Sequence, residues 1–374
     1  MNKMNFQQLC VLGLASFVNQ TTLATEAPQL KYGWVDVFST ELQIPDTVKP
    51  ILNDQWMRDT FIKQAPDGYY YMTGTIRPEG KSNARVNSPG IQLWRSKDMK
   101  DWEDLGLVYN PDHDDSWHGR LGKNKGKRHT VWAPEIHYIE SQKTFFIIAC
   151  TPYPERGTFV LRSTSGKAEG PYIDIAGSQD SPIINAIDGS LFEDDDGTVY
   201  LVSLSHKIAR MKDDMSDVAE PFKKIKQQQY TPEPNVLEGA YIVKEGGQYH
   251  LILSAFSTEL PDGSYNYQAG RKGNVYPNNK EMWEHFYSYD VIVASANSPY
   301  GPYSERYTSI VGAGHNNFFK DQDGRWWSTH FSNPWKTKNK RSFRELASAI
   351  PLRIEDGKFY PDFEYSKKYY GPNN

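Results

Sequence analysis

Hydrophobic and polar positions along this chain alternate over short stretches, which is typical of β-strands. Segments such as Tyr69–Thr75 and Val199–Leu204 alternate or run apolar over strand lengths, and no stretch keeps an apolar 3.6-residue period for four helical turns. Gly, Pro and Asp residues separate these segments, as expected at turns. The pattern predicts an all-β protein.

A short aromatic strand, led by Gly or a polar residue, recurs along the chain. The five copies are Asp67–Tyr71, Gln142–Phe146, Asp196–Tyr200, Gly246–His250 and Asp323–Trp327. Without two polar insertions, Asn110–Thr130 and Glu259–Phe286, the period is about fifty residues, long enough for several strands per repeat. We therefore expect one domain, residues 28–374, built as a five-bladed β-propeller, rather than a pair of β-sandwiches or a β-helix.

An ionisable side chain stands about eight residues before each aromatic strand, where the first strand of a repeat would begin. These residues are Asp59, Glu135, Asp188, Glu238 and His315. The first strand of a propeller blade lines the central channel, so we expect the five side chains to meet there.

Carboxylates gathered in one place cannot all ionise at their ordinary pKa values, so one can stay protonated beside another that is charged. Hydrolysis of a glycosidic bond uses such a pair, an acid for the leaving oxygen and a base or nucleophile opposite. Carboxylates on different blades would leave room for a water molecule between them, which favours inversion. The pattern alone does not say which carboxylate plays which part.

Composition favours one kind of ligand and argues against another. Aromatic residues make up 14% of the 374 residues, and their rings form flat surfaces on which sugars stack. A net charge of -4 argues against nucleic acid as a partner. We expect sugar contacts from residues near the inner strands, namely Trp56, Trp94, Trp132 and Phe256, and contacts to acidic groups from Arg58, Arg85 and Arg344.

The beginning of the chain resembles an export signal. Lys3 precedes the apolar run Leu9–Val18, and small residues follow near Ala24 and Ala27. We expect a signal peptide at residues 1–27 and a monomeric protein that is periplasmic or secreted. The apolar run is too short to span a membrane. Of the two cysteines, Cys10 lies in the expected signal, so Cys150 is interpreted as a core residue.

Several motifs, in order along the chain from about Asp59 to Arg344, resemble glycoside hydrolase family 43. They are Arg58–Ile62, Asp67–Thr75, Trp132–Ile136, Ile187–Gly197, Leu237–Tyr241 and Gly314–Asn316. The resemblance implies a five-bladed propeller that cleaves glycosidic bonds with inversion. Commonly such enzymes are exo-acting β-xylosidases, α-L-arabinofuranosidases or galactosidases, here acting on fragments of plant or algal polysaccharides.

The same resemblance implies roles for the ionisable residues. Asp59 would be the general base, Glu238 the general acid, and Asp188 the residue that tunes and orients the acid. Glu135 would support the site or bind substrate, and His315 would face the channel, where it could help to hold a structural calcium ion through water. No cofactor is expected to be required.

Two other functions remain open from the sequence. One is a propeller that binds sugar without catalysis. The other is an eliminase or dehydratase acting on uronic-acid oligosaccharides, in which a His or Tyr removes a proton beside the carboxylate; His315 and His137 are candidates.

Overall fold

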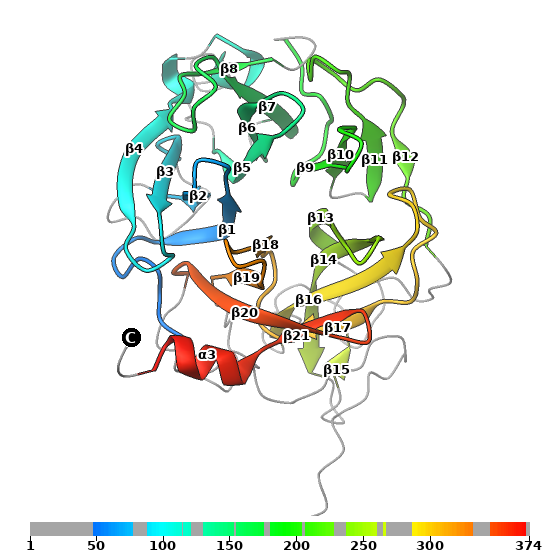
Figure 1. Ribbon diagram of the computed structural model, residues 1–374. Helices are drawn as coiled ribbons and strands as arrows, with labels where there is room; N and C mark the ends of the chain where they lie inside the picture. Colours follow the sequence, from blue (N-terminus) through cyan, green and yellow to red (C-terminus); the bar gives the residue numbers. More distant parts are fainter. Residues whose placement is uncertain are drawn as a thin grey trace, which may run out of the picture.

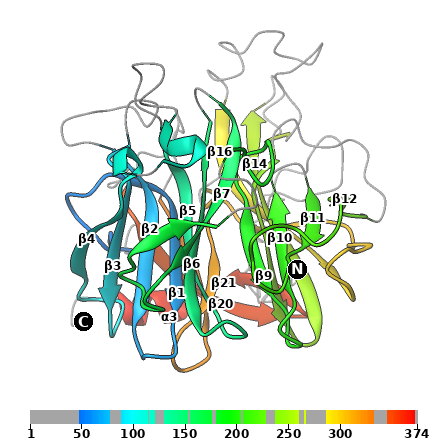
Figure 2. The same ribbon diagram turned by 90° about the horizontal axis from the view of Figure 1, so that it is seen from above.

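Five antiparallel sheets surround a central channel, with each sheet forming one blade of a propeller (Figure 1). Figure 2 shows the ring from the side, with its strands running between the two faces. The computed structural model describes residues 48–77, 88–113, 115–120, 130–152, 155–175, 180–203, 206–227, 237–259, 265–266, 286–331 and 345–371. The expected signal peptide lies outside these residues, as do Arg85, Arg344, residues 114 and 121–129 of the first insertion and most of the second insertion.

Each blade consists of strands that follow one another in the sequence, from the channel outward. Blade 1 contains β1 (Met57–Gln64), β2 (Tyr70–Ile76), β3 (Ile91–Ser96) and β4 (Glu103–Tyr109). Blade 2 contains β5 (Trp132–Ile139), β6 (Thr144–Thr151), β7 (Gly157–Ser163) and β8 (Tyr172–Asp174). Blade 3 contains β9 (Ser190–Glu193), β10 (Val199–Ser203), β11 (Lys207–Arg210) and β12 (Lys223–Lys224).

The last two blades complete the ring. Blade 4 contains β13 (Leu237–Glu245), β14 (Gln248–Glu259), β16 (Phe286–Ala296) and β17 (Tyr307–Ile310), with β15 (Tyr265–Asn266) paired to β14. Blade 5 contains β18 (Phe318–Lys320), β19 (Trp326–His330), β20 (Ser348–Glu355) and β21 (Lys358–Pro361). A 3-10 turn, η1 (Pro111–His113), follows blade 1, and a helix, α3 (Phe363–Tyr369), follows blade 5.

The predicted all-β, five-bladed propeller is thus confirmed, and the aromatic segments lead into the second strand of each blade. Strands β2 and β6 are buried along their whole length, which explains why apolar residues there do not alternate with polar ones. The core is divided into five main hydrophobic clusters, one at each boundary between neighbouring blades. Packing between blades therefore fixes where the inner strands lie.

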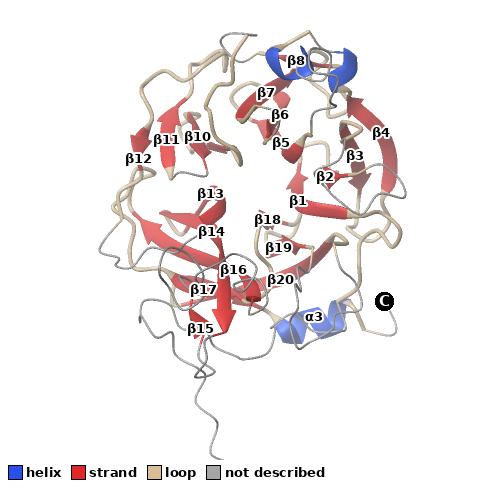
Figure 3. Ribbon diagram, turned by 180° about the vertical axis from the view of Figure 1, so that it is seen from behind, coloured by secondary structure: helices blue, strands red, loops and turns tan. Residues whose placement is uncertain are grey.

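The ring closes between blades 5 and 1 through side chains and the terminal helix. The Asn317 amide accepts a hydrogen bond from the Ile62 N–H and donates one to the Ile62 C=O, both at 2.9 Å. Helix α3 lies beside β20 (Figure 3), where the Tyr369 ring packs against Trp327 at 4.9 Å and its hydroxyl donates to the Asp98 carbonyl at 3.4 Å. Among the described residues, no helix is long and apolar enough to span a membrane.

Candidate active site

Five residues with a left-handed backbone mark one end of the channel. They are Asp59 (φ 53°), Ala133 (φ 45°), Asp188 (φ 55°), Gly239 (φ 56°) and His315 (φ 54°). In β1, β5 and β13 this residue opens a bulge in the pairing with the second strand. A non-glycine residue with positive φ costs about 1 to 3 kcal/mol and persists only where its surroundings hold it. The repeated bulge is thus a built feature of the inner strands.

This register corrects the alignment expected from the sequence. Ala133 and Gly239, not Glu135 and Glu238, are the counterparts of Asp59. Glu135 lies two residues after the bulge position and Glu238 one residue before it. The reason is that the inner hairpins differ in length, since the left-handed turn residue comes one position later in blade 2, at Lys143, than in blade 1, at Gly68.

Asp59 is held by two contacts from opposite sides. The Thr75 hydroxyl donates to its Oδ2 at 2.6 Å, and the His315 Nδ1 lies 3.1 Å from its Oδ1. Burial by itself would lower the pKa of His315, but the carboxylates of Asp59, Asp188 and Glu238 outweigh it and raise that pKa above its ordinary value. Asp59 therefore lies beside a histidine whose protonated form the surrounding carboxylates favour.

Asp188 is more deeply buried, with 6% of its surface exposed. Its Oδ2 accepts the Gly239 N–H at 3.3 Å, so the carboxyl lies next to the residue that follows Glu238. Burial raises the pKa of Asp188 to about 7; the charge of His315 opposes this rise, and those of Glu238 and Asp59 add to it. Asp188 can therefore hold or release a proton near neutral pH.

Glu238 has a partner that its neighbours in sequence do not reveal. The Tyr289 hydroxyl donates to its Oε2 at 2.8 Å from β16. Tyr289 is fully buried, and burial, followed by the charges of Glu238 and Asp188, raises its pKa well above the ordinary value. Tyr289 therefore stays protonated and fixes one oxygen of Glu238, leaving the other for a ligand.

Three of the predicted substrate contacts lie close to these residues. The Phe256 ring stacks on Tyr289 at 4.3 Å. Trp56 donates its indole N–H to Glu345 at 2.5 Å, and the Arg58 guanidinium lies 3.8 Å from the same carboxylate. Their roles in binding substrate remain predictions.

The remaining predictions for substrate contacts have different outcomes. The prediction for Trp94 is wrong, because this residue is 3% exposed and belongs to the core between blades 5 and 1. Trp132 directly precedes the bulge of blade 2 and is half-buried, so its role stays a prediction. Glu135 Oε2 is hydrogen-bonded to His137 Nε2 at 2.9 Å, which ties its carboxylate to its own strand, consistent with a supporting role. Arg344 lies outside the described residues.

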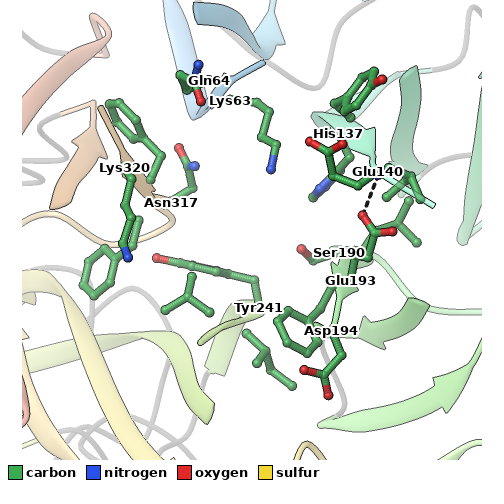
Figure 4. Close-up of a pocket in the computed structure, with 18 of the residues that line it drawn as sticks. Lys63, Gln64, His137, Glu140, Ser190, Glu193, Asp194, Tyr241, Asn317 and Lys320 are labelled. Atoms are coloured by element: carbon green, nitrogen blue, oxygen red, sulfur yellow. Dashed lines mark hydrogen bonds between the residues drawn. The ribbon is translucent and has the colours of Figure 1, made fainter. Parts of the chain in front are cut away.

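A cavity of about 750 Å³ occupies the other end of the channel (Figure 4). Lys63, His137 and Ser190, from three inner strands, line it along with Glu193. Both Glu193 oxygens accept backbone N–H groups, of Glu140 and Ser141, at 2.7 Å. Asp59, Asp188 and Glu238 are not among its lining residues, so this cavity is distinct from the carboxylate cluster.

The residues around His315 do not fit a directly bound metal ion. Calcium takes six to eight oxygen ligands. Within the described ranges, no group of three or more His, Cys, Asp and Glu side chains is placed to hold a metal. His315 directs Nδ1 to Asp59, and its ring packs against Gly239. The imidazole is therefore engaged with the carboxylate cluster itself.

The fold and the site place this chain among the β-propellers that carry a cluster of carboxylates in the central channel. The family model for glycosyl hydrolases family 43 matches residues 47–359. The chain belongs to this family, and the predicted resemblance is confirmed.

Individual relatives share parts of the chain. A β-D-galactofuranosidase, xynD, of Aspergillus niger is 30% identical over 44% of this chain and 43% of its own length. A xylosidase/arabinosidase, 43B, of Humicola insolens is 23% identical over 82% of this chain and 53% of its own. This chain thus spans about half the length of these curated relatives.

The solved structures support the fold. An endo-1,4-β-xylanase of Bacteroides thetaiotaomicron superposes with a TM-score of 0.56 at 23% identity, covering 84% of this chain and 96% of that one. An endo-arabinase of the same organism gives a TM-score of 0.55 at 19% identity, covering 85% of this chain and all of that one. At these identities the likeness establishes the propeller alone.

Proposed function

We propose that this protein hydrolyses glycosidic bonds with inversion of the anomeric centre. Asp59 acts as the base that takes a proton from the attacking water, and Glu238 protonates the leaving oxygen. Asp188, whose pKa burial raises to about 7, orients the acid: its carboxyl accepts the N–H of Gly239, the residue after Glu238. The observation that carries the proposal is the convergence of three carboxylates from three blades, each with a different set of partners.

The reaction balances without a cofactor. Water supplies the hydroxyl for the sugar, its proton goes to Asp59, and the Glu238 proton goes to the departing oxygen. Proton exchange with solvent then restores both side chains. We propose that removing divalent metal ions with EDTA leaves turnover unchanged; a loss of turnover restored by calcium would contradict this.

For the substrate, we propose an exo action on xylosides, arabinofuranosides or galactosides at the ends of plant or algal oligosaccharides. Support comes from the names of the relatives, which include a galactofuranosidase, a xylosidase/arabinosidase and a xylanase. The range of these names means that aryl glycosides of all three sugars, and natural oligosaccharides, should be screened together.

Elimination is the less favoured chemistry because it needs a deprotonated base. The pKa of His315 lies above its ordinary value, despite burial, because of the surrounding carboxylates, and burial raises the pKa of Tyr289 well above its own. Both shifts favour the protonated side chain. Burial instead lowers the pKa of His137, but this residue lines the cavity at the other end of the channel. An absorbance from an unsaturated sugar product would reverse this preference.

The test of the proposal is the kinetics of Asp59→Asn and Glu238→Gln on the best substrate. We expect kcat to fall at least about 10²-fold in each, the usual range for loss of an acid or base. Asp323→Asn, an exposed turn carboxylate, is the matched control and should keep full activity. Nuclear magnetic resonance of the first product should show the inverted anomer. Unchanged kcat in both site variants would refute the assignment and favour a sugar-binding protein.

We also propose that the protein is exported, on the basis of the signal-like residues 1–27, and, as a separate proposal, that it is a monomer. Cell fractionation, sequencing of the mature N-terminus and light scattering test these points. An intact N-terminus on cytoplasmic protein would contradict export.

A further inference from the structure

One position on the second strand makes the same contact in three blades. Thr75, Cys150 and Ser254 pair with Arg58, Trp132 and Glu238, the residues just before the bulges of their own blades. Each side chain accepts the N–H of the left-handed residue in the next blade. We call these three the clasp residues.

The clasp contacts differ in length and in chemistry. The hydroxyl oxygens of Thr75 and Ser254 lie 2.7 and 2.5 Å from the N–H nitrogens of Ala133 and His315. The Cys150 sulfur lies 3.4 Å from the Asp188 nitrogen. Among the three N–H groups, only that of Asp188, in blade 3, is accepted by a sulfur atom rather than an oxygen atom.

The Thr75 clasp also directs a proton to a carboxylate. A hydroxyl has one proton, and because the Thr75 oxygen accepts the Ala133 N–H, that proton is free to go to Asp59. The resulting contact to Asp59 Oδ2 measures 2.6 Å. A short O–H bond to a charged oxygen is among the stronger hydrogen bonds and favours the carboxylate over the acid.

The Cys150 clasp offers no such bond. A thiol is a weak donor, and Cys150 lies 3.9 Å from Asp188 Oδ1 and 3.4 Å from the Trp132 carbonyl, so its proton has two distant acceptors. Asp59 and Asp188 therefore share one backbone conformation, with φ of 53° and 55°, but receive unequal hydrogen bonding.

Other charged groups also face Asp188, from each inner strand nearby. His315 opposes a rise in the pKa of Asp188, while Glu238 and Asp59 increase it, after the larger effect of burial. These charges act on the whole cluster, whereas a clasp residue touches one aspartate. A change of clasp chemistry therefore isolates the local contribution.

We propose that the clasp residues set the two aspartates apart through unequal hydrogen bonding: Thr75 donates a short hydrogen bond to Asp59, and Cys150 withholds a strong hydrogen bond from Asp188. Both are positioning residues, since they act through the aspartates. The inference rests on the proposed function for its kinetic test, but not for its spectroscopic one.

The first pair of variants is Cys150→Ser and Thr75→Val. Cys150→Ser places a stronger donor beside Asp188, and the acid limb of the kcat/KM profile should move down by about one pH unit. Thr75→Val keeps the shape but removes the donor to Asp59; kcat should fall about tenfold or more with KM unchanged, and the acid limb should move up. Thr75→Ser should restore the wild-type profile.

The control is Ala149→Ser, a change of similar size on the neighbouring buried residue, which lies in the core between blades 1 and 2. It should lower the Tm and leave the pH profile in place. Identical profiles for Cys150→Ser and wild type, or a shift of the same size in Ala149→Ser, would overturn the proposal.

An infrared titration separates this inference from the proposed function. The band of a protonated carboxyl that disappears near neutral pH, and that Asp188→Asn removes, reports Asp188 without any substrate. In Cys150→Ser this band should disappear at lower pH. If it does so in a protein without glycosidase activity, the clasp inference stands and the proposed function fails; an unmoved band overturns the clasp inference whatever the activity.

Discussion

The Tyr289 hydroxyl donates a 2.8 Å hydrogen bond to Glu238, across 51 positions of sequence. Tyr289 is immobilised by the stacked Phe256 ring and by Gly314, whose N–H donates to its carbonyl and whose Cα leaves no room for a side chain beside the ring. The orientation of the proposed acid therefore depends on blade 4 and on the loop that enters blade 5.

Replacing this hydroxyl should slow the chemical step. For Tyr289→Phe we expect kcat to fall about 10- to 100-fold with little change in KM, because Glu238 loses the bond that orients it but substrate contacts remain. Steady-state kinetics test this. Tyr303→Phe removes another buried hydroxyl, bonded to the Pro299 carbonyl, and should retain activity. Equal effects of the two substitutions would show a loss of stability rather than of orientation.

Asp188 should contribute stability that is lost as pH rises from about 4 to about 7, while His206, whose pKa burial lowers to about 4, contributes in the opposite direction over part of this window. Burial lifts the pKa of Asp188 from 3.8 to about 7, so between these values the folded chain binds more protons at this site than the unfolded one. A pKa difference of one between the two states is equivalent to about 1.4 kcal/mol, giving a loss of a few kcal/mol across the window. The stabilisation of charged His315 is lost in the same direction as pH rises further.

Asp188→Asn should remove the Asp188 part of this pH dependence. Urea unfolding at pH 5 and at pH 8 measures it: the variant should gain stability relative to wild type at the higher pH. A stability difference that is the same at both pH values would contradict the raised pKa of Asp188.

A single methyl group at Gly239 should disturb the site. A Cβ there would lie 2.8 Å from the His315 ring, so Gly239→Ala should displace His315 from Asp59 and reduce kcat. Gly246→Ala provides a matched control, because Gly246 has a similar φ of 59° and no atom within 4 Å of an added Cβ. Both variants should lose about 1 to 2 kcal/mol from left-handed strain, but only Gly239→Ala should lose activity.

The two hydrogen bonds between Asn317 and Ile62 should stabilise the contact between blades 5 and 1 that closes the ring. Asn317→Leu leaves both buried Ile62 backbone groups without their partner, for an expected loss of about 2 to 5 kcal/mol in the free energy of unfolding. Asn53→Leu, at an exposed position, is the control and should change stability little. Urea denaturation distinguishes the two; a loss below about 0.5 kcal/mol for Asn317→Leu would show that closure depends on other contacts.

The fold was predictable because its signal is local and repeated. The segment Asp67–Tyr71 and its four counterparts carry turn chemistry and strand-forming residues together, so five copies reveal five blades. Asp59, Asp188 and His315 keep a constant spacing to the turn, and the structure shows that they share one backbone conformation.

Other features depend on contacts that short-range sequence cannot encode. The bulges at Ala133 and Gly239 were missed because hairpin lengths vary, and Tyr289 because its partner lies beyond an insertion. Trp94 was misassigned because its local pattern does not show that it lies on β3, the third strand of blade 1, where it joins the core between blades 5 and 1. The clasp role of Cys150 becomes visible only when its blade is superimposed on those of Thr75 and Ser254.

The contact between Asp59 and His315 has one further consequence. Asp59 belongs to the first blade and His315 to the last, and each blade is completed by its own strands. The proposed base is therefore assembled at the one junction that the continuous chain does not join. Opening this junction would separate the two residues while every sheet remained intact. On gradual denaturation, turnover should therefore fall before circular dichroism detects a loss of strand structure.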